Sequence, residues 1–91
     1  MDLNNIRSQI DSLDAELVEQ FLKRMNLCKE VAQYKKEHGL PIFVPEREEA
    51  VLSRVEALSG EEMSPYTQEL FRKIMELSKQ YQFTVMGKEV K

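Results

Sequence analysis

Arg24 and Lys35 are basic residues at positions where a helix should carry hydrocarbon side chains. A helix turns by about 100° per residue, so residues that share a face can be counted along the sequence. Lys35 follows Arg24 by about three turns and returns to nearly the same direction. The apolar residues within roughly 60° of that direction are Leu3, Ile6, Ile10, Leu13, Leu17, Phe21, Cys28 and Val31. A buried cation is costly unless it is paired, so both side chains need a partner of negative charge.

Other polar residues lie beside apolar faces farther along the chain. Arg47 and Glu48 flank the apolar side of a second predicted helix, in its first turn. Ser78 and Gln82 lie one turn apart on a third, and Arg7 lies at the edge of the first stripe. Arginine binds carboxylates through a two-pronged fork, and lysine acts as a point charge. A cavity lined by these cations, one carboxylate and one amide therefore suits a small ligand with several negative charges.

A structural explanation also accounts for each of these residues taken singly. Arg24 and Lys35 could pair with glutamates of the later helices or extend to solvent, and the remaining arginines could be solvated charges. No Ser or Cys has an evident neighbouring base, so any chemistry must work through positioning and electrostatic stabilisation. We interpret His38 as a helix-end residue and Cys28 as core filler.

The first predicted helix is too long for the domain. Aliphatic spacing of three and four residues runs from Leu3 to about Tyr34, and His38-Gly39 provides a C-terminal stop. Such a helix is about 50 Å long, whereas a compact chain of 91 residues has a radius of gyration of only about 12 Å. Its far end should therefore pack on another chain, and we expect an intertwined homodimer.

Two shorter helices are predicted after a linker. The second starts at Pro45 and ends at Ser59-Gly60, and the third starts at Pro65 and runs to about Phe83. The apolar sides are Val51, Leu52, Val55 and Leu58 in the second helix, and Leu70, Phe71, Ile74, Met75, Leu77 and Tyr81 in the third. Residues 86–91 are expected to form a loose tail. The predicted fold is one all-α domain over residues 1–91, with three helices.

The composition favours a small cytoplasmic protein. The net charge of −3 argues against a role in binding nucleic acid or a membrane surface. No apolar run approaches the length of a membrane span, and the N-terminal residues lack the hydrophobic region of a signal peptide. One cysteine and one histidine disfavour a disulfide framework or a zinc site. We therefore expect neither a metal nor a cofactor.

Over nearly its whole length the sequence resembles the all-α chorismate mutases. The segment "LNNIRSQIDSLDAELVEQFLKRMNLCKEVAQYK" is similar to the long helix of that family, with its pattern R..ID.LD..L..L...R......V...K. The segment "PIFVPEREEAVLSRV" carries the Arg-Glu pair after the linker, and "LFRKIMELSKQYQ" carries the Ser-x-x-x-Gln ending. The three segments in this order, with compatible gaps, make the resemblance specific.

The resemblance implies both a fold and a reaction. The fold is an intertwined six-helix homodimer of three-helix chains. The reaction is the Claisen rearrangement of chorismate to prephenate in phenylalanine and tyrosine biosynthesis, a unimolecular step that needs no cofactor.

The resemblance also implies a role for each site residue. Arg24 corresponds to the arginine that grips a substrate carboxylate, and Arg7 to the arginine that enters from the partner chain. Lys35 and Gln82 correspond to the groups that bond the ether oxygen, where negative charge develops as the C–O bond breaks. Glu48 corresponds to the carboxylate that holds the ring hydroxyl. The supporting polar contacts are Arg47 and Ser78.

One position departs from the family pattern. Many relatives carry an aspartate three residues before the arginine of the Arg-Glu pair, where this chain has Val44, followed by Pro45. Recognition of the ring hydroxyl then rests more heavily on Glu48. Relatives are often fused to prephenate dehydratase, prephenate dehydrogenase or an aldol-type synthase, and we expect a free-standing enzyme or a domain excised from such a fusion.

Two alternatives share the predicted fold. An isochorismate pyruvate lyase resembles the mutases and has the same clamp of arginine and lysine, but it eliminates pyruvate. Glu48 directly after Arg47 favours the mutase. The second alternative is a non-catalytic helical dimer that binds a chorismate-like metabolite or the helices of a partner, and it predicts binding without turnover.

Overall fold

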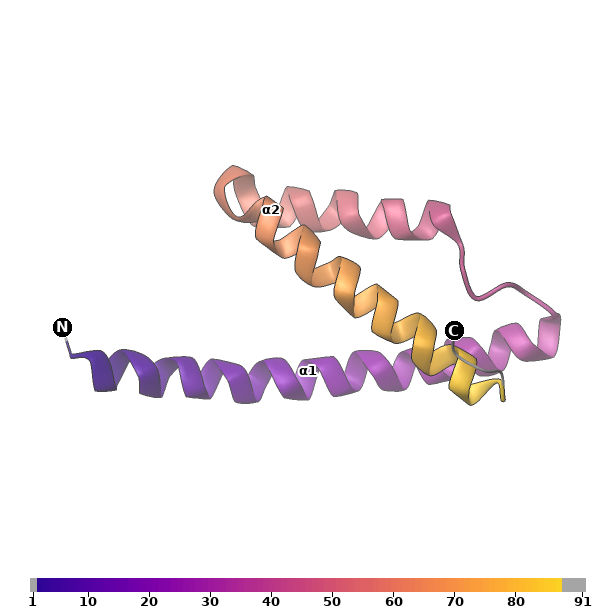
Figure 1. Cartoon of the computed structure of the whole chain (residues 1–91), viewed down its shortest axis with the longest axis horizontal. Coiled ribbons are helices and arrows are strands. Elements are labelled where there is room, and N and C mark those ends of the chain that lie inside the picture. The colour runs from indigo at the N-terminus through magenta and orange to yellow at the C-terminus, as the bar shows by residue number, and fades with distance from the viewer. Residues whose placement is uncertain (1, 88–91) are drawn as a thin grey trace.

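The computed structural model describes residues 2–87, which fold into two helices, α1 (Leu3–His38) and α2 (Pro45–Val85). Figure 1 shows α1 extending along the length of the molecule, with α2 folded back on itself as a hairpin of two arms. We call residues 45–59 of α2 its first arm and residues 61–85 its second arm. Residues 2–87 contain no strand, so the all-α prediction is confirmed.

Both ends of α1 are set by local chemistry. The Asp2 carboxylate accepts a hydrogen bond from the Asn4 backbone N–H at 3.0 Å, which caps the first turn. At the other end Gly39 adopts the left-handed conformation (φ 63°, ψ 34°), and its N–H bonds the Lys35 carbonyl. The predicted stop at His38-Gly39 is therefore confirmed, and the helix is about 54 Å long at 1.5 Å per residue.

The structure has two helices, α1 and α2, where three were predicted, and α2 joins the two later predicted helices across a kink at Gly60, where the second was predicted to end. Residues 61–64, expected to separate two helices, are themselves helical, and α2 is continuous from Pro45 to Val85 apart from Gly60. Gly60 has φ 77° and ψ 167°, a conformation that is open essentially only to glycine. One residue therefore reverses the chain where a loop was expected. Pro65 consequently lies inside α2 rather than at the start of a new helix.

The hydrophobic core consists of two small clusters. The first joins α1 to the linker and the C-terminal end of α2 through Ala32, Ile42 and Met86. The second joins the two arms of α2; its members are Val51, Val55 and Met75, with Leu52 and Phe71 packed against them. Met86, which was expected to belong to a loose tail, is 7% exposed in the first cluster. Residues 88–91 of that expected tail lie outside the described residues.

Much of the predicted apolar surface is exposed in the single chain. The side chains along the N-terminal half of α1 are uncovered, with Leu13 57% and Leu17 62% exposed. Leu58, expected on the buried side of the first arm, is 80% exposed because no other part of residues 2–87 lies over it. In Figure 1 the hairpin of α2 diverges from the N-terminal half of α1. No helix in the described part of the chain combines the length and apolar character needed to cross a membrane.

Candidate active site

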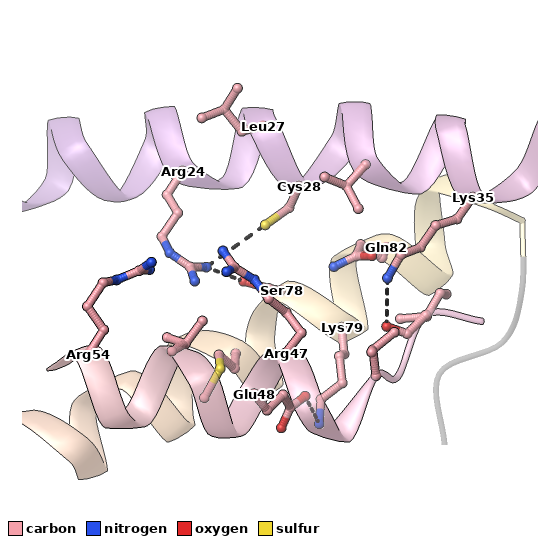
Figure 2. Close-up of a pocket in the computed structure, with 15 residues that line it drawn as sticks. Arg24, Leu27, Cys28, Lys35, Arg47, Glu48, Arg54, Ser78, Lys79 and Gln82 are labelled. Carbon is pink, nitrogen blue, oxygen red and sulfur yellow. Dashed lines mark hydrogen bonds and ion pairs between the residues drawn. The ribbon is translucent and has the colours of Figure 1, made fainter. Parts of the chain in front are cut away.

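A pocket of about 370 Å³ lies between the C-terminal half of α1 and both arms of α2 (Figure 2). This volume is within the range of small-molecule sites. Six of the seven residues predicted from the sequence line it: Arg24, Lys35, Arg47, Glu48, Ser78 and Gln82. Two come from α1, two from the start of the first arm and two from the second arm, so the pocket depends on all three segments being packed together.

Arg24 is held in the pocket by a neutral partner. Its Nη1 donates to Ser78 Oγ at 3.1 Å, and that hydroxyl in turn donates to the Ile74 carbonyl at 2.8 Å. The guanidinium carbon lies 6.0 Å from the centre of the Phe71 ring, which adds a weak cation–π contact. Within residues 2–87 no carboxylate pairs with Arg24, so the structural explanation by a helix glutamate fails for this residue.

Lys35 and Gln82 lie at the other end of the pocket (Figure 2). Lys35 Nζ donates to the Ile42 carbonyl at 3.0 Å, and Ile42 is itself buried in the first core cluster. The linker therefore fixes the ammonium group and leaves its other N–H bonds available. Gln82 is buried, and among the described residues its Oε1 has no hydrogen-bond partner. Because an unpaired buried carbonyl oxygen is costly, Gln82 Oε1 has unused capacity to accept a hydrogen bond from a ligand.

Two charged residues of the pocket were missed by the sequence analysis, Arg54 and Lys79. Arg54 follows Arg47 by two turns of the first arm, a spacing that places both on one face. Lys79 precedes Gln82 by three residues, which is also a same-face spacing. Lys79 Nζ lies 2.9 Å from Glu48 Oε2. Helical periodicity could have indicated both residues, because each lies on the same face as a residue that the sequence analysis named.

The charges of the pocket are strongly unbalanced. It contains one carboxylate, Glu48, and five cations: Arg24, Lys35, Arg47, Arg54 and Lys79. The guanidinium groups of Arg24, Arg47 and Arg54 point toward the same part of the pocket (Figure 2), and within residues 2–87 none of the three has an ion-pair partner. Converging arginines that have no ion-pair partner are suited to an anion that carries carboxylate or phosphate groups.

Arg7 is the one predicted site residue that lies outside the pocket. It is exposed near the N-terminus of α1, about 25 Å along the helix axis from Arg24. A rigid helix cannot bring Arg7 to the pocket of its own chain. Cys28, predicted as core filler, instead lines the pocket wall, and so does Val44 at the position where many relatives carry aspartate. Residues 2–87 contain no cluster of His, Cys, Asp and Glu that could hold a metal ion.

Comparison with known proteins gives a consistent result. The sequence profile of the family described as chorismate mutase type II matches residues 6–83. The chain is 43% identical to the T-protein of Haemophilus influenzae over 75 residues, which are 80% of this chain and 20% of that protein. It is 37% identical over 59 residues to the chorismate mutase of Methanocaldococcus jannaschii, covering 65% of this chain and 60% of that protein. It is 34% identical over 53 residues to the 4-amino-4-deoxychorismate mutase of Streptomyces venezuelae, with coverages of 58% and 52%. The comparison with solved structures gave no match.

The chain belongs to the chorismate mutase type II family, because the family profile covers most of its length. The resemblance inferred from the three sequence segments is thus confirmed. The chain spans about a fifth of the Haemophilus T-protein and 60% of the Methanocaldococcus chorismate mutase.

Proposed function

We propose that this chain catalyses the Claisen rearrangement of chorismate to prephenate. The observation that carries the proposal is the convergence of the cations Arg24, Arg47 and Lys35 with the buried side-chain amide of Gln82 in one pocket. Chorismate carries two carboxylates, which suit the excess of positive charge. Its reaction breaks the C–O ether bond and forms a C–C bond within the same molecule, so it requires no proton transfer, nucleophile or redox group.

The proposed mechanism combines positioning with electrostatics. Arg24, with Arg47 in support, binds one substrate carboxylate and favours the conformer in which the enolpyruvyl arm folds over the ring. Lys35 Nζ and the Gln82 side-chain amide donate hydrogen bonds to the ether oxygen. Those bonds strengthen as negative charge develops there, so they act mainly on the transition state. Glu48 accepts a hydrogen bond from the ring hydroxyl.

We further infer that the active protein is a homodimer in which Arg7 reaches the pocket of the partner chain. The chain exposes 7256 Å², whereas a folded monomer of its 10.7 kDa mass exposes about 5500 Å². Its radius of gyration is 16.2 Å, against about 12 Å for a compact monomer. Both values are larger than those of a compact monomer because the apolar stripe on the N-terminal half of α1 is exposed. In the proposed dimer a second copy of the chain covers this stripe.

A second candidate substrate is 4-amino-4-deoxychorismate, because one relative carries the name of a mutase for that compound. It differs from chorismate by an amine in place of the ring hydroxyl. The isochorismate pyruvate lyase and the non-catalytic dimer also remain as alternatives, since both use a cationic pocket.

The first test of the proposal is turnover of chorismate by the purified protein, with identification of the product and with isochorismate in parallel. We expect prephenate, and we expect Lys35→Ala and Gln82→Ala to lower kcat by about 10²- to 10³-fold each, because each removes a donor to the developing charge. Circular dichroism and sedimentation must show that both variants fold as the wild type does. Pyruvate from isochorismate would establish the lyase instead, and binding of chorismate without turnover would establish the binding module.

A further inference from the structure

The single carboxylate of the pocket is already paired within the chain. Lys79 Nζ lies 2.9 Å from Glu48 Oε2, and the pair joins the second arm of α2 to the first turn of the first arm (Figure 2). The two side chains are 30% and 26% exposed, so the pair is partly shielded from water. Lys79 Nζ also lies 4.7 Å from the centre of the Phe43 ring, which holds it from the linker side.

The ion pair with Lys79 leaves one oxygen of the Glu48 carboxylate able to accept hydrogen bonds. An ionised carboxylate only accepts hydrogen bonds, and Lys79 occupies Oε2. The free Oε1 can accept from a neutral hydroxyl without disturbing the pair. An ammonium group at the same place would lie beside the ammonium of Lys79, and juxtaposed like charges in a shielded site oppose binding. Val44 supplies no second carboxylate on this side of the pocket to offset that repulsion.

We propose that Lys79 is a specificity-determining residue that makes Glu48 select a neutral hydroxyl on the substrate ring and reject an amine there. The inference rests on the proposed function, in which Glu48 binds the substituent at that ring position. Lys79 acts through Glu48 and is therefore a positioning residue rather than a catalytic one. It also neutralises the carboxylate, so that Glu48 does not repel the anionic substrate as it enters.

The test compares kcat/KM for chorismate and for 4-amino-4-deoxychorismate in the wild type and in Lys79→Met. We expect the preference for the hydroxyl compound to fall by on the order of tenfold or more in Lys79→Met, because an unpaired Glu48 attracts the amine. The change in kcat/KM should come mainly from KM rather than kcat, since Glu48 contacts this part of the ring equally in the ground state and the transition state. Lys79→Arg keeps the positive charge and should restore the preference to within about threefold of the wild type.

A control separates this role from a structural one. Lys73 lies on the same arm in an exposed pair with Glu76, and Lys73→Met should leave the preference unchanged. If Lys79 merely held the fold together, Lys79→Met would lower activity on both substrates equally. A preference within about twofold of the wild type in Lys79→Met would thus overturn the inference and leave the mutase proposal standing.

The same experiment tests the proposed function independently of the role of Lys79. Absence of turnover of both compounds by the wild type would overturn the mutase proposal. The dissociation constants of the same two compounds, measured by calorimetry in the same variants, would then decide the role of Lys79. The ratio to compare is the dissociation constant of 4-amino-4-deoxychorismate divided by that of chorismate. A lower ratio in Lys79→Met than in the wild type supports the role of Lys79, and an unchanged ratio refutes it.

Discussion

The Arg24 guanidinium lies half-buried on the apolar stripe of α1, and its hydrogen-bond partners among residues 2–87 are the neutral Ser78 hydroxyl and the Cys28 sulfur. A partly buried cation without an anion opposes folding, since the protein replaces its hydration incompletely. Under the proposed function the same feature favours binding, because a substrate carboxylate would meet a guanidinium that is already oriented and partly desolvated. At this position stability and binding therefore make opposite demands.

Arg24→Met separates these two demands. We expect the free energy of unfolding to stay the same or rise by about 1 kcal/mol, because an apolar side chain of similar length suits the stripe. We also expect kcat/KM for chorismate to fall by about 10²- to 10³-fold, because the charged fork for one carboxylate is lost. Urea denaturation and steady-state kinetics provide the two measurements.

Arg24→Lys is the matched control, since it keeps the charge without the fork and should lie between Met and the wild type in activity. Activity of Arg24→Met within about tenfold of the wild type would contradict the role given to Arg24.

At the scale of the element, the hairpin of α2 depends on one residue. Gly60 has φ 77°, and apart from the adjacent backbone of its own helix and its chain neighbours nothing lies within 4 Å of the position that a Cβ would occupy there. A larger side chain at Gly60 would therefore meet open space, and its cost would come from the backbone conformation alone. The reversal matters for the site because it brings the second arm, with Ser78, Lys79 and Gln82, against the first arm with Arg47 and Glu48.

Gly60→Ala tests this dependence. We expect the free energy of unfolding to fall by about 1–3 kcal/mol, measured by urea denaturation at a fixed protein concentration, because alanine is strained at this φ and ψ. Gly39 is the control, since it too has a positive φ of 63° and nothing within 4 Å of its Cβ position. Asparagine tolerates that left-handed conformation, so Gly39→Asn should cost much less. A change of under about 0.5 kcal/mol in Gly60→Ala would show that the bend does not depend on glycine.

At the scale of the whole molecule, the site of one chain is incomplete if the proposed function holds. The molecule measures 55 × 26 × 21 Å, and its longest dimension is close to the length of α1 itself. The N-terminal half of α1 thus extends away from the small core. A symmetric dimer would cover this half and bring the Arg7 of each chain to the pocket of the other.

Mixing two inactive variants tests the exchange of Arg7. Arg7→Ala and Lys35→Ala should each lose most activity as homodimers. After the two are mixed, unfolded and refolded together, heterodimers should contain one intact site, made from the Lys35 of one chain and the Arg7 of the other. Random pairing then restores about one quarter of the wild-type activity.

As a control, each variant is unfolded and refolded alone, and no activity should return. A mixture that stays as inactive as its components, although sedimentation shows heterodimers, would contradict a shared site. Sedimentation as a monomer would contradict the dimer itself.

The sequence by itself determined the local and periodic features of this protein. The stop of α1 at Gly39 and the start of α2 at Pro45 follow from side chains and backbone groups within one turn of each position. The inward direction of Arg24 and Lys35 follows from helical periodicity, which depends on spacing alone. The three motif segments indicated the family because they carry most of the pocket residues.

Only the tertiary structure decided how segments distant in sequence meet. The reversal at Gly60 without a loop, the burial of Met86 and the exposure of Leu58 all depend on where one element ends relative to another. The pairing of Lys79 with Glu48 also depends on how the two arms of α2 pack together. The physical reason is that a helix determines the direction of each side chain relative to its own axis, whereas the distance between two side chains on different arms depends on the packing of the whole chain.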